Sequence, residues 1–360
     1  MALLLAALTA GCGGGGGTSA SCPAEQVQTL EADMNTQLAQ AESEVDFSFA
    51  VERKDGRRYT FNRGASTLQT VYESASTSKL VAAVIIMRLV EQGYLSLSAK
   101  PQDLIQSWPI PSDDTLYAMT LANLMSFTSG LTIEPDCLND ANSDLETCVI
   151  IIANTNAGNG KTPGSQFFYK ATHQDVAGLM AVKAFEAVKA SGVKSWQDVF
   201  KDFQAQTGMF PTTKFNVPSE TNPRIAGGMH FTGDEYMAFL SALKQGRLLN
   251  AASMSQLLAD HTASIPIFDS PFMSGIGGGP GLGEDWHFGF GLAHECRSAT
   301  WNCVAGARVS SPGAFGSYPF WDRSKGYTGI VVRQGLFGTL VTGILIERSV
   351  RSTVEQWAAC

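Results

Sequence analysis

The chain has 360 residues, of which 44% are hydrophobic, so it can bury a full core in one large domain or two interleaved domains. Its 33 acidic and 25 basic residues give a formal net charge of -8, which argues against a nucleic-acid-binding protein. Beyond the first residues no apolar run is long enough to span a bilayer, which argues against an integral membrane protein.

The first residues predict an export signal. Met1–Ala10 is apolar and ends in small residues, as in a secretory signal, although a basic n-region is missing. The run Leu8–Cys12 resembles the end of a bacterial lipoprotein signal, in which Cys12 would be lipidated and would anchor the protein to a membrane. The glycine and serine residues that follow are typical of a flexible tether, so residues 1–22 are excluded from the fold. We expect an exported protein, either a periplasmic or outer-membrane lipoprotein or a secreted protein.

A helix and a hairpin are predicted next. Residues 24–43 carry the apolar stripe of an amphipathic helix. Phe47–Val51 alternates like a strand, Asp55 and Gly56 form a hairpin turn, and Arg58–Asn62 returns as a second strand. These residues therefore begin a sheet.

The polar run Tyr72–Lys79 leads directly into the apolar run Leu80–Met87, which predicts a central buried helix that ends near Gln92. Ser76 and Lys79 are three residues apart, so they share a helix face and can touch. A serine hydroxyl needs a base to become a nucleophile, and a lysine is a base only where burial or a neighbouring cation keeps it neutral. The apolar run supplies that burial. The alternative is a Ser/Thr-rich N-cap before a core helix.

The Ser-x-x-Lys pattern occurs three times, so by itself it does not identify a site. Ser191–Lys194 lies in a glycine-containing turn between helices. Ser241–Lys244 ends an amphipathic helix, where Lys244 is expected to be solvated. Only Ser76 begins a helix that is apolar on nearly every face, and a helix N-terminus also favours an alkoxide.

The region from residue 94 to 280 is predicted to be mostly helical, with long loops. Thr120–Ser126 is a short helix capped by Thr120. Longer helices are predicted over residues 172–190, 195–206 and 233–244. The glycine-rich run Gly275–Gly283 does not follow a strand and open a helix, so it predicts a mobile surface loop rather than a nucleotide site.

The last 80 residues predict strands separated by short turns. The predicted strands are His287–Ala293, Ala305–Ser310, Gly313–Asp322, Gly326–Arg333 and Leu336–Glu347. A helix over Thr353–Cys360 follows them.

These elements predict an α+β fold. An antiparallel sheet of about five strands would be flanked by the two terminal helices, lying side by side on one face, with a large helical insertion between its two parts. We expect a sheet domain of residues 23–73 plus 284–360 and a mainly helical domain of residues 74–283, with the active site between them.

Six cysteines remain when Cys12 is set aside, and an even number in an exported chain suggests disulfides. Proximity suggests the pairs Cys137–Cys148, Cys296–Cys303 and, between the two ends, Cys22–Cys360. A zinc site is the alternative, but no Cys-x-x-Cys or paired histidine spacing supports it.

Four segments together carry a family resemblance. They are Ser76–Lys79, Leu124–Leu131, Phe168–Gly178 and Ser311–Ala314. In order and spacing they are similar to the motifs of the serine β-lactamase and penicillin-binding-protein superfamily, particularly the class C β-lactamases and the related esterases and D-amino-acid peptidases. The resemblance covers roughly residues 24–360 and implies the β-lactamase and transpeptidase fold.

The resemblance also implies a mechanism. Ser76 would attack a carbonyl to form an acyl-enzyme, while Lys79 and Tyr169 share the role of base, with Lys79 as the cation that stabilises the tyrosine phenolate. The backbone N–H groups of Ser76 and Ala314 would form the oxyanion hole. Gly313 would let the substrate lie close to its strand.

Two departures from the family pattern bear on the substrate. Ala171 stands where the family usually has an asparagine two residues after the tyrosine, and the neutral Ser311 stands where it usually has a cation or histidine. His173 is a candidate for the lost polar contact, or a structural histidine. Both departures weaken recognition of a substrate carboxylate, by a few kcal/mol where that group is buried.

We therefore predict an exported serine hydrolase that acts through a Ser76 acyl-enzyme on small esters, amides or peptides. The alternatives are a β-lactamase or D-alanyl-D-alanine carboxypeptidase and, from another class, a catalytically silent binding module of the cell envelope. No metal, organic cofactor or nucleic-acid partner is implied, and the sequence does not predict an oligomeric state.

Overall fold

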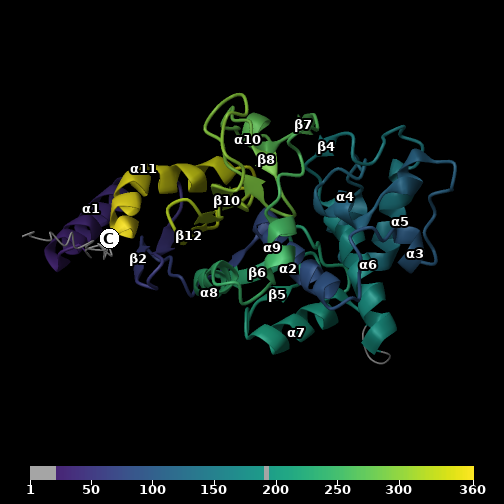
Figure 1. The fold of residues 1–360 in the computed structure, drawn as a ribbon, viewed down its shortest axis with the longest axis horizontal. Helices are drawn as coiled ribbons and strands as arrows, with labels where there is room; N and C mark the ends of the chain where they lie inside the picture. Colours follow the sequence, from purple (N-terminus) through teal and green to yellow (C-terminus); the bar gives the residue numbers. More distant parts are fainter. Residues whose placement is uncertain (1–21, 190–193) are drawn as a thin grey trace, which may run out of the picture.

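The computed structural model describes residues 22–189 and 194–360. Cys12, most of the leader and tether, and Ser191 lie outside these ranges. The main sheet has seven antiparallel strands in the order β2-β1-β12-β11-β10-β9-β8 (Figure 1). Its strands are β1 (Phe47–Glu52), β2 (Arg58–Asn62), β8 (His287–Phe288), β9 (Ala293–His294), β10 (Arg308–Ser310), β11 (Tyr318–Asp322) and β12 (Tyr327–Arg333). The α+β class is thus confirmed, but the edge pair β8 and β9 enlarges the sheet beyond the five strands expected.

Both faces of the sheet are covered, so its central strands are buried throughout. On β1, Phe49 packs into one hydrophobic core with α1 (Ala24–Gln40) and α11 (Leu340–Ala359). Ala50, which points the other way, packs into the second core, which contains the central helix. Helix α8 (Gly233–Lys244) lies against β1 and β12 on that second face. The sheet therefore separates the two cores, and the central helix belongs to the second one.

The two terminal helices pack side by side, as expected, and the Cys22–Cys360 disulfide joins their ends (Figure 1). The strand predicted over Leu336–Glu347 is wrong, because α11 begins at Leu340. Its apolar, partly β-branched run is typical of a strand. It forms a helix because α11 is covered by α1 on one side and by the sheet on another, which buries apolar side chains around much of its circumference.

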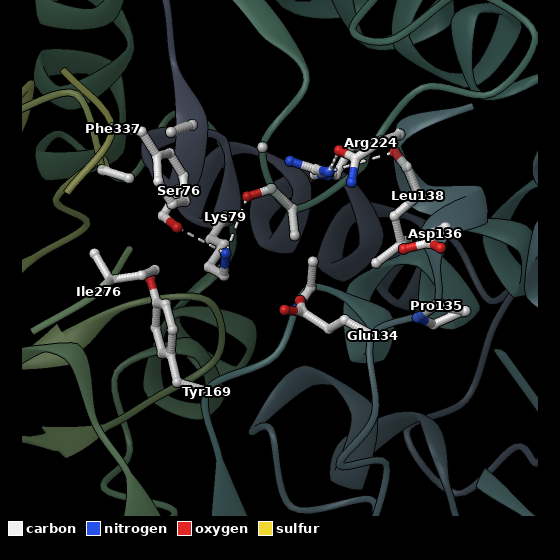
Figure 2. Close-up of a pocket in the computed structure, with 16 residues that line it drawn as sticks. Ser76, Lys79, Glu134, Pro135, Asp136, Leu138, Tyr169, Arg224, Ile276 and Phe337 are labelled. Atoms are coloured by element: carbon white, nitrogen blue, oxygen red, sulfur yellow. Dashed lines mark hydrogen bonds between the residues drawn. The ribbon is translucent and has the colours of Figure 1, made fainter. Parts of the chain in front are cut away.

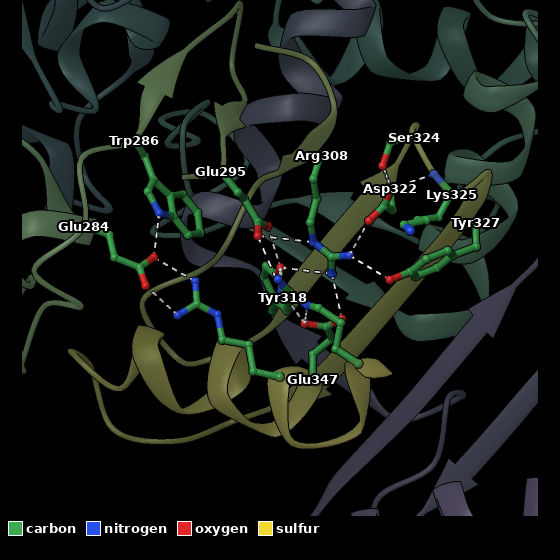
Figure 3. Close-up of polar contacts among 12 residues, drawn as sticks. Glu284, Trp286, Glu295, Arg308, Tyr318, Asp322, Ser324, Lys325, Tyr327 and Glu347 are labelled. Atoms are coloured by element: carbon green, nitrogen blue, oxygen red, sulfur yellow. Dashed lines mark hydrogen bonds and ion pairs between the residues drawn. The ribbon is translucent and has the colours of Figure 1, made fainter. Parts of the chain in front are cut away.

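A buried network of charges ties α11 to the sheet (Figure 3). Arg308 on β10 lies 2.7 Å from the Glu347 carboxylate of α11, and 3.2 Å from the carboxylates of Glu295 and Asp322. It also donates to the Tyr327 hydroxyl at 2.9 Å. A buried charge without its partner is costly, so these contacts fix one position of α11 against the strands.

The helical insertion carries the remaining elements. Its helices are α2 (Ser78–Glu91), α3 (Pro101–Leu104), α4 (Leu121–Met125), α5 (Leu145–Asn156), α6 (Thr172–Lys189), α7 (Trp196–Thr207), α8, α9 (Ala251–Leu257) and α10 (Pro271–Ser274). Three 3-10 turns are η1 (Ala75–Thr77), η2 (Thr115–Ala118) and η3 (Asp136–Asn139). Small sheets join β3 (Val71–Glu73) to β6 (Met229–Thr232) and β5 (Lys214–Phe215), and β4 (Phe167–Phe168) to β7 (Ile267–Asp269). None of the helices in the described ranges has both the length and the apolar composition needed to cross a membrane.

The remaining disulfides, Cys137–Cys148 and Cys296–Cys303, are the pairs that proximity in the sequence suggested.

Candidate active site

Ser76 lies in η1, directly before the central helix α2. Ala75 before it has a φ of 42°, in the left-handed region that residues with a Cβ rarely adopt. Ser74 anchors this turn, because its amide donates to the Met229 carbonyl at 2.8 Å and its hydroxyl accepts from the Met229 amide at 3.0 Å. The turn places Ser76, which is 7% exposed, at the wall of a pocket.

Lys79 is the immediate partner of Ser76. Its Nζ donates to Ser76 Oγ at 2.9 Å and to the Ala226 carbonyl at 3.0 Å. Burial lowers the pKa of Lys79 to about 8, although the carboxylates of Glu134 and Asp175 oppose the shift. A minor fraction of Lys79 is thus neutral at pH 7, and this form can accept the proton of Ser76.

Tyr169 follows β4, and its hydroxyl points toward Ser76 from the opposite wall (Figure 2). The Lys79 amine lies 4.7 Å from the centre of its ring. Although the residue is partly exposed, burial around its hydroxyl raises the pKa of Tyr169 above its usual value, and the Ser76 hydroxyl opposes this only in part. The expected phenolate is therefore not favoured at neutral pH, which suits Tyr169 to relaying a proton.

The segment directly after β10, which was predicted to be a strand from Gly313, is a turn that contacts the nucleophile's own backbone. Ser311 is buried and donates to the carbonyl oxygen of Ser76 at 3.0 Å. A Cβ on Gly313 would lie 2.3 Å from the Ser74 carbonyl oxygen and 2.6 Å from Thr77 Oγ1. Ser311 and Gly313 were expected to contact the substrate. In the structure they instead allow the segment after β10 to pack against the Ser76 turn. Ala314 lines the pocket beside Ser76.

His173 does not supply the polar contact expected of it. It is fully buried; its Nε2 donates to the Phe168 carbonyl at 2.9 Å, and its Nδ1 accepts from the Ser129 hydroxyl at 2.8 Å. Burial lowers the pKa of His173 to about 3, so the ring is neutral and neither nitrogen is left for a substrate. The structural alternative describes it. Ala171 does line the pocket, and its amide donates to Glu134 at 2.6 Å.

The pocket has a volume of about 380 Å³ and two unlike sides (Figure 2). Ile276 and Phe337 form an apolar wall on the side of Ser76, whereas Glu134, Asp136 and Arg224 lie beyond Lys79 on the other side. None of these five residues belongs to a motif recognised in the sequence. The nearest signal is the Cys137–Cys148 disulfide, which fixes the segment after Asp136.

The expectation for Lys244 is also corrected. Lys244 of the third Ser-x-x-Lys copy is not solvated, because it pairs with the buried Glu52 at 3.3 Å, to which Ser241 also donates.

The glycine-rich run is packed against the turn before α11: a Cβ on Gly279 would lie 1.9 Å from the Gly338 carbonyl oxygen. This close approach explains the glycines and brings Ile276 of the same run to the pocket.

Solved structures with this fold include hydrolases. The structure resembles a β-lactamase of Bacteroides dorei described as putative, with a TM-score of 0.71, 19% identity, and coverage of 90% of this chain and 98% of that chain. It is also similar to EstCE1, a hydrolase with promiscuous acyltransferase activity, with a TM-score of 0.68, 17% identity, and coverage of 91% and 98%. Together they define the β-lactamase and transpeptidase-like fold.

The chain belongs to the Beta-lactamase family, whose model matches residues 46–341. The protein is therefore a serine hydrolase of the β-lactamase and penicillin-binding-protein type, as the sequence motifs predicted. Penicillin-binding protein 4 of Amycolatopsis lactamdurans is 24% identical over 138 residues, which are 38% of this chain. That match spans about a third of the relative, 34% of its length.

Proposed function

We propose that the protein is an exported serine hydrolase that forms an acyl-enzyme at Ser76, with small esters as its best substrates and amides or peptides next. One observation carries the proposal: the 2.9 Å contact between Lys79 Nζ and Ser76 Oγ in the wall of the pocket. A buried lysine with a lowered pKa is the base that a serine nucleophile needs.

The proposed reaction has two halves. Ser76 Oγ bonds to the substrate carbonyl carbon while its proton passes to Lys79, and the amides of Ser76 and Ala314 stabilise the oxyanion. The leaving group departs with a proton relayed by Tyr169. Water then attacks the carbonyl carbon of the acyl-enzyme and gives its proton to the Tyr169 and Lys79 pair. A proton returns from this pair to Ser76 Oγ, and the carboxylic acid product leaves. In this proposal the site lies between the sheet domain, residues 23–73 plus 284–360, and the helical domain, residues 74–283.

The preference for esters rests on what lines the pocket next to Ser76. Ser311 is neutral and its hydroxyl is already bonded to the Ser76 carbonyl, so this strand position offers no cation to a substrate carboxylate. Ile276 and Phe337 offer an apolar surface on the same side. A β-lactamase or D-alanyl-D-alanine carboxypeptidase remains the alternative, supported by the family and by the match to Penicillin-binding protein 4.

Export is supported by the three disulfides, since such bonds persist in oxidising compartments. Lipidation at Cys12 is the corresponding proposal for membrane attachment. Mass measurement of the mature N-terminus tests it: a diacylglyceryl or triacyl modification on Cys12 is expected, whereas an unmodified or uncleaved terminus would exclude it.

Labelling with a fluorophosphonate tests the enzyme proposal. The wild type is expected to gain one adduct, Ser76→Ala none, and the matched control Ser241→Ala, from another copy of the pattern, one adduct. If the wild type takes no adduct, the silent binding module is favoured. For the substrate, p-nitrophenyl butyrate is expected to be hydrolysed with a higher kcat/KM than a chromogenic cephalosporin, and the reverse order would favour the β-lactamase alternative.

A further inference from the structure

The Lys79 amine has few groups to hold it. In the part of the chain that the structure describes, it donates to Ser76 Oγ and to the Ala226 carbonyl. Ala171, two residues after Tyr169, has no side-chain acceptor to offer. The Ala226 carbonyl therefore orients the amine wherever Ser76 is occupied by an acyl group, and the position of this carbonyl depends on what holds residues 224–227.

Helix α6 holds that segment through a buried carboxylate. Asp175 is 1% exposed, and its Oδ1 accepts from the Ile225 amide at 2.7 Å. The Ile225 side chain packs against Gly178 on the same helix, so closely that a Cβ there would lie 2.6 Å from Ile225 Cγ1. The neighbouring Gln174 donates to the Lys79 carbonyl at 3.0 Å. Helix α6 thus binds both the backbone of Lys79 and the segment that accepts from its amine.

Only one of the two carboxylate oxygens of Asp175 is used by the contact with Ile225. Its second oxygen, Oδ2, is buried and has no hydrogen-bond partner within the described ranges. A buried carboxylate with one unsatisfied oxygen is expensive to keep, and a packing role alone would be served by a neutral side chain. Packing alone therefore does not explain why residue 175 carries a carboxylate.

We propose that Asp175 is a positioning residue for the base of this enzyme: it fixes the Ala226 carbonyl against Lys79, and its carboxylate is a buried anion that favours the charged form of that lysine. The inference rests on the proposed function, in which Lys79 is the base for Ser76. It adds a residue that touches neither substrate nor nucleophile.

The charges around the pair agree with this role. Lys79 is faced by Glu134 before η3 and by Arg224 before the Ala226 carbonyl. It is also faced by two neutral residues, Tyr169 before α6 and His173 in α6. Burial raises the pKa of Asp175 to about 7, opposed by the Ile225 amide, Arg224 and Lys79, and reinforced by Glu134. Glu134 is exposed to water and Arg224 partly so, whereas Asp175 is fully buried. The charge of Asp175 is therefore screened less by water than that of Glu134 or Arg224. Asp175 and Lys79 titrate as a coupled pair.

The test compares Asp175→Asn, which keeps an oxygen for the Ile225 amide and removes the charge, with Asp175→Leu, which removes both. The pH profile of kcat/KM for p-nitrophenyl butyrate is measured. For Asp175→Asn we expect the acidic limb to move down by about one pH unit with a plateau near that of wild type, because Lys79 loses an anion that favours its protonated form. For Asp175→Leu we expect the same shift and a plateau at least about tenfold lower. Glu146→Gln, which removes a partly exposed carboxylate of α5 that pairs with Lys183 at 2.7 Å, is expected to change neither.

A direct readout does not depend on turnover. In lysine-labelled protein carrying Ser76→Ala, ¹⁵N NMR follows the titration of Lys79 Nζ, and Asp175→Asn is expected to lower its midpoint. If Asp175→Asn leaves the acidic limb where the wild type has it and this midpoint where Ser76→Ala alone has it, the inference is overturned while Ser76 labelling still supports the hydrolase. If the wild type takes no Ser76 adduct, the proposed function fails, and the NMR midpoint alone decides whether Asp175 controls Lys79.

Discussion

Ser311 Oγ donates a 3.0 Å hydrogen bond to the carbonyl oxygen of Ser76, so the segment after β10 is bound to the backbone of the nucleophile. We expect Ser311→Ala to lower kcat/KM for p-nitrophenyl butyrate about fivefold, because a net contribution of about 1 kcal/mol is lost and the Ser76 turn is less firmly held. The control is Thr328→Val, which removes a buried hydroxyl with no hydrogen-bond partner among the described residues. A rate equal to wild type in both variants would show that the contact does not position Ser76.

The wild-type activity should depend on pH through Lys79. Its pKa is lowered to about 8, and the neutral form is the base, so kcat/KM is expected to rise with pH through about 8 and to fall about tenfold per unit well below it. Lys79→Arg should lose at least about 100-fold at every pH, because a guanidinium stays protonated. A flat wild-type profile between pH 6 and 9 would contradict a lysine base.

Tyr169→Phe separates a proton relay from a phenolate base. Since burial raises the pKa of Tyr169, we expect kcat to fall about 100-fold while the midpoint of the acidic limb stays with Lys79. Tyr94→Phe, at a partly buried tyrosine in the hydrophobic core beyond the end of α2, is the matched control and should retain full activity. A kcat unchanged by Tyr169→Phe would remove Tyr169 from the mechanism.

The buried charge network predicts a stability effect away from the pocket. Glu347 lies 2.7 Å from Arg308 and 2.5 Å from Arg351, so Glu347→Gln leaves two buried guanidinium groups short of an anion. We expect the free energy of unfolding to fall by about 3–5 kcal/mol, measured by urea denaturation. Glu355→Gln on the same helix breaks only an exposed pair at 4.0 Å with Lys325 and should change it by less than about 0.5 kcal/mol. Equal effects would mean that the network contributes no more than a surface pair.

The Cys22–Cys360 disulfide spans 338 residues and ties α1 to α11. Replacing both cysteines by serine is expected to destabilise the protein by about 2–5 kcal/mol and to lower Tm by several degrees, with kcat/KM at 25 °C unchanged. The pair Cys296–Cys303, which spans seven residues, is the comparison and should cost less, because it closes a much shorter loop. The reverse order would show that loop length does not decide the effect.

Local chemistry made much of this structure predictable. The helix over Gly233–Lys244 was predicted with the bounds it has, and in the structure Thr232 caps its start. The strand Arg58–Asn62 follows from its Asp-Gly turn. Ser76 and Lys79 were likewise paired through their spacing of three residues, together with the family resemblance of four segments, although Ser76 lies in η1 and Lys79 in α2. These features depend on residues that are close in the sequence.

Contacts between distant segments were not predictable in the same way. Leu340–Ile346 became a helix because of what covers it. The single strand predicted over His287–Ala293 is wrong, because this stretch is the hairpin of β8 and β9, whose two-residue strands are too short to show a period. Ser311 was expected to face the substrate, but its direction is set by the approach of its strand to the Ser76 turn. Asp175 had no motif at all, since its partner Ile225 lies 50 residues away along the chain.

The bond between Cys22 and Cys360 also has a topological consequence. Their Cα atoms are 5.0 Å apart, so the described chain is nearly a closed ring with its two ends at one place on the surface. A short peptide linker could therefore replace the disulfide and join residue 360 to residue 22. New ends could then be opened at an exposed turn far from Ser76, such as the one at Asp55–Gly56, to give a circular permutant with the same sheet order and the same pocket.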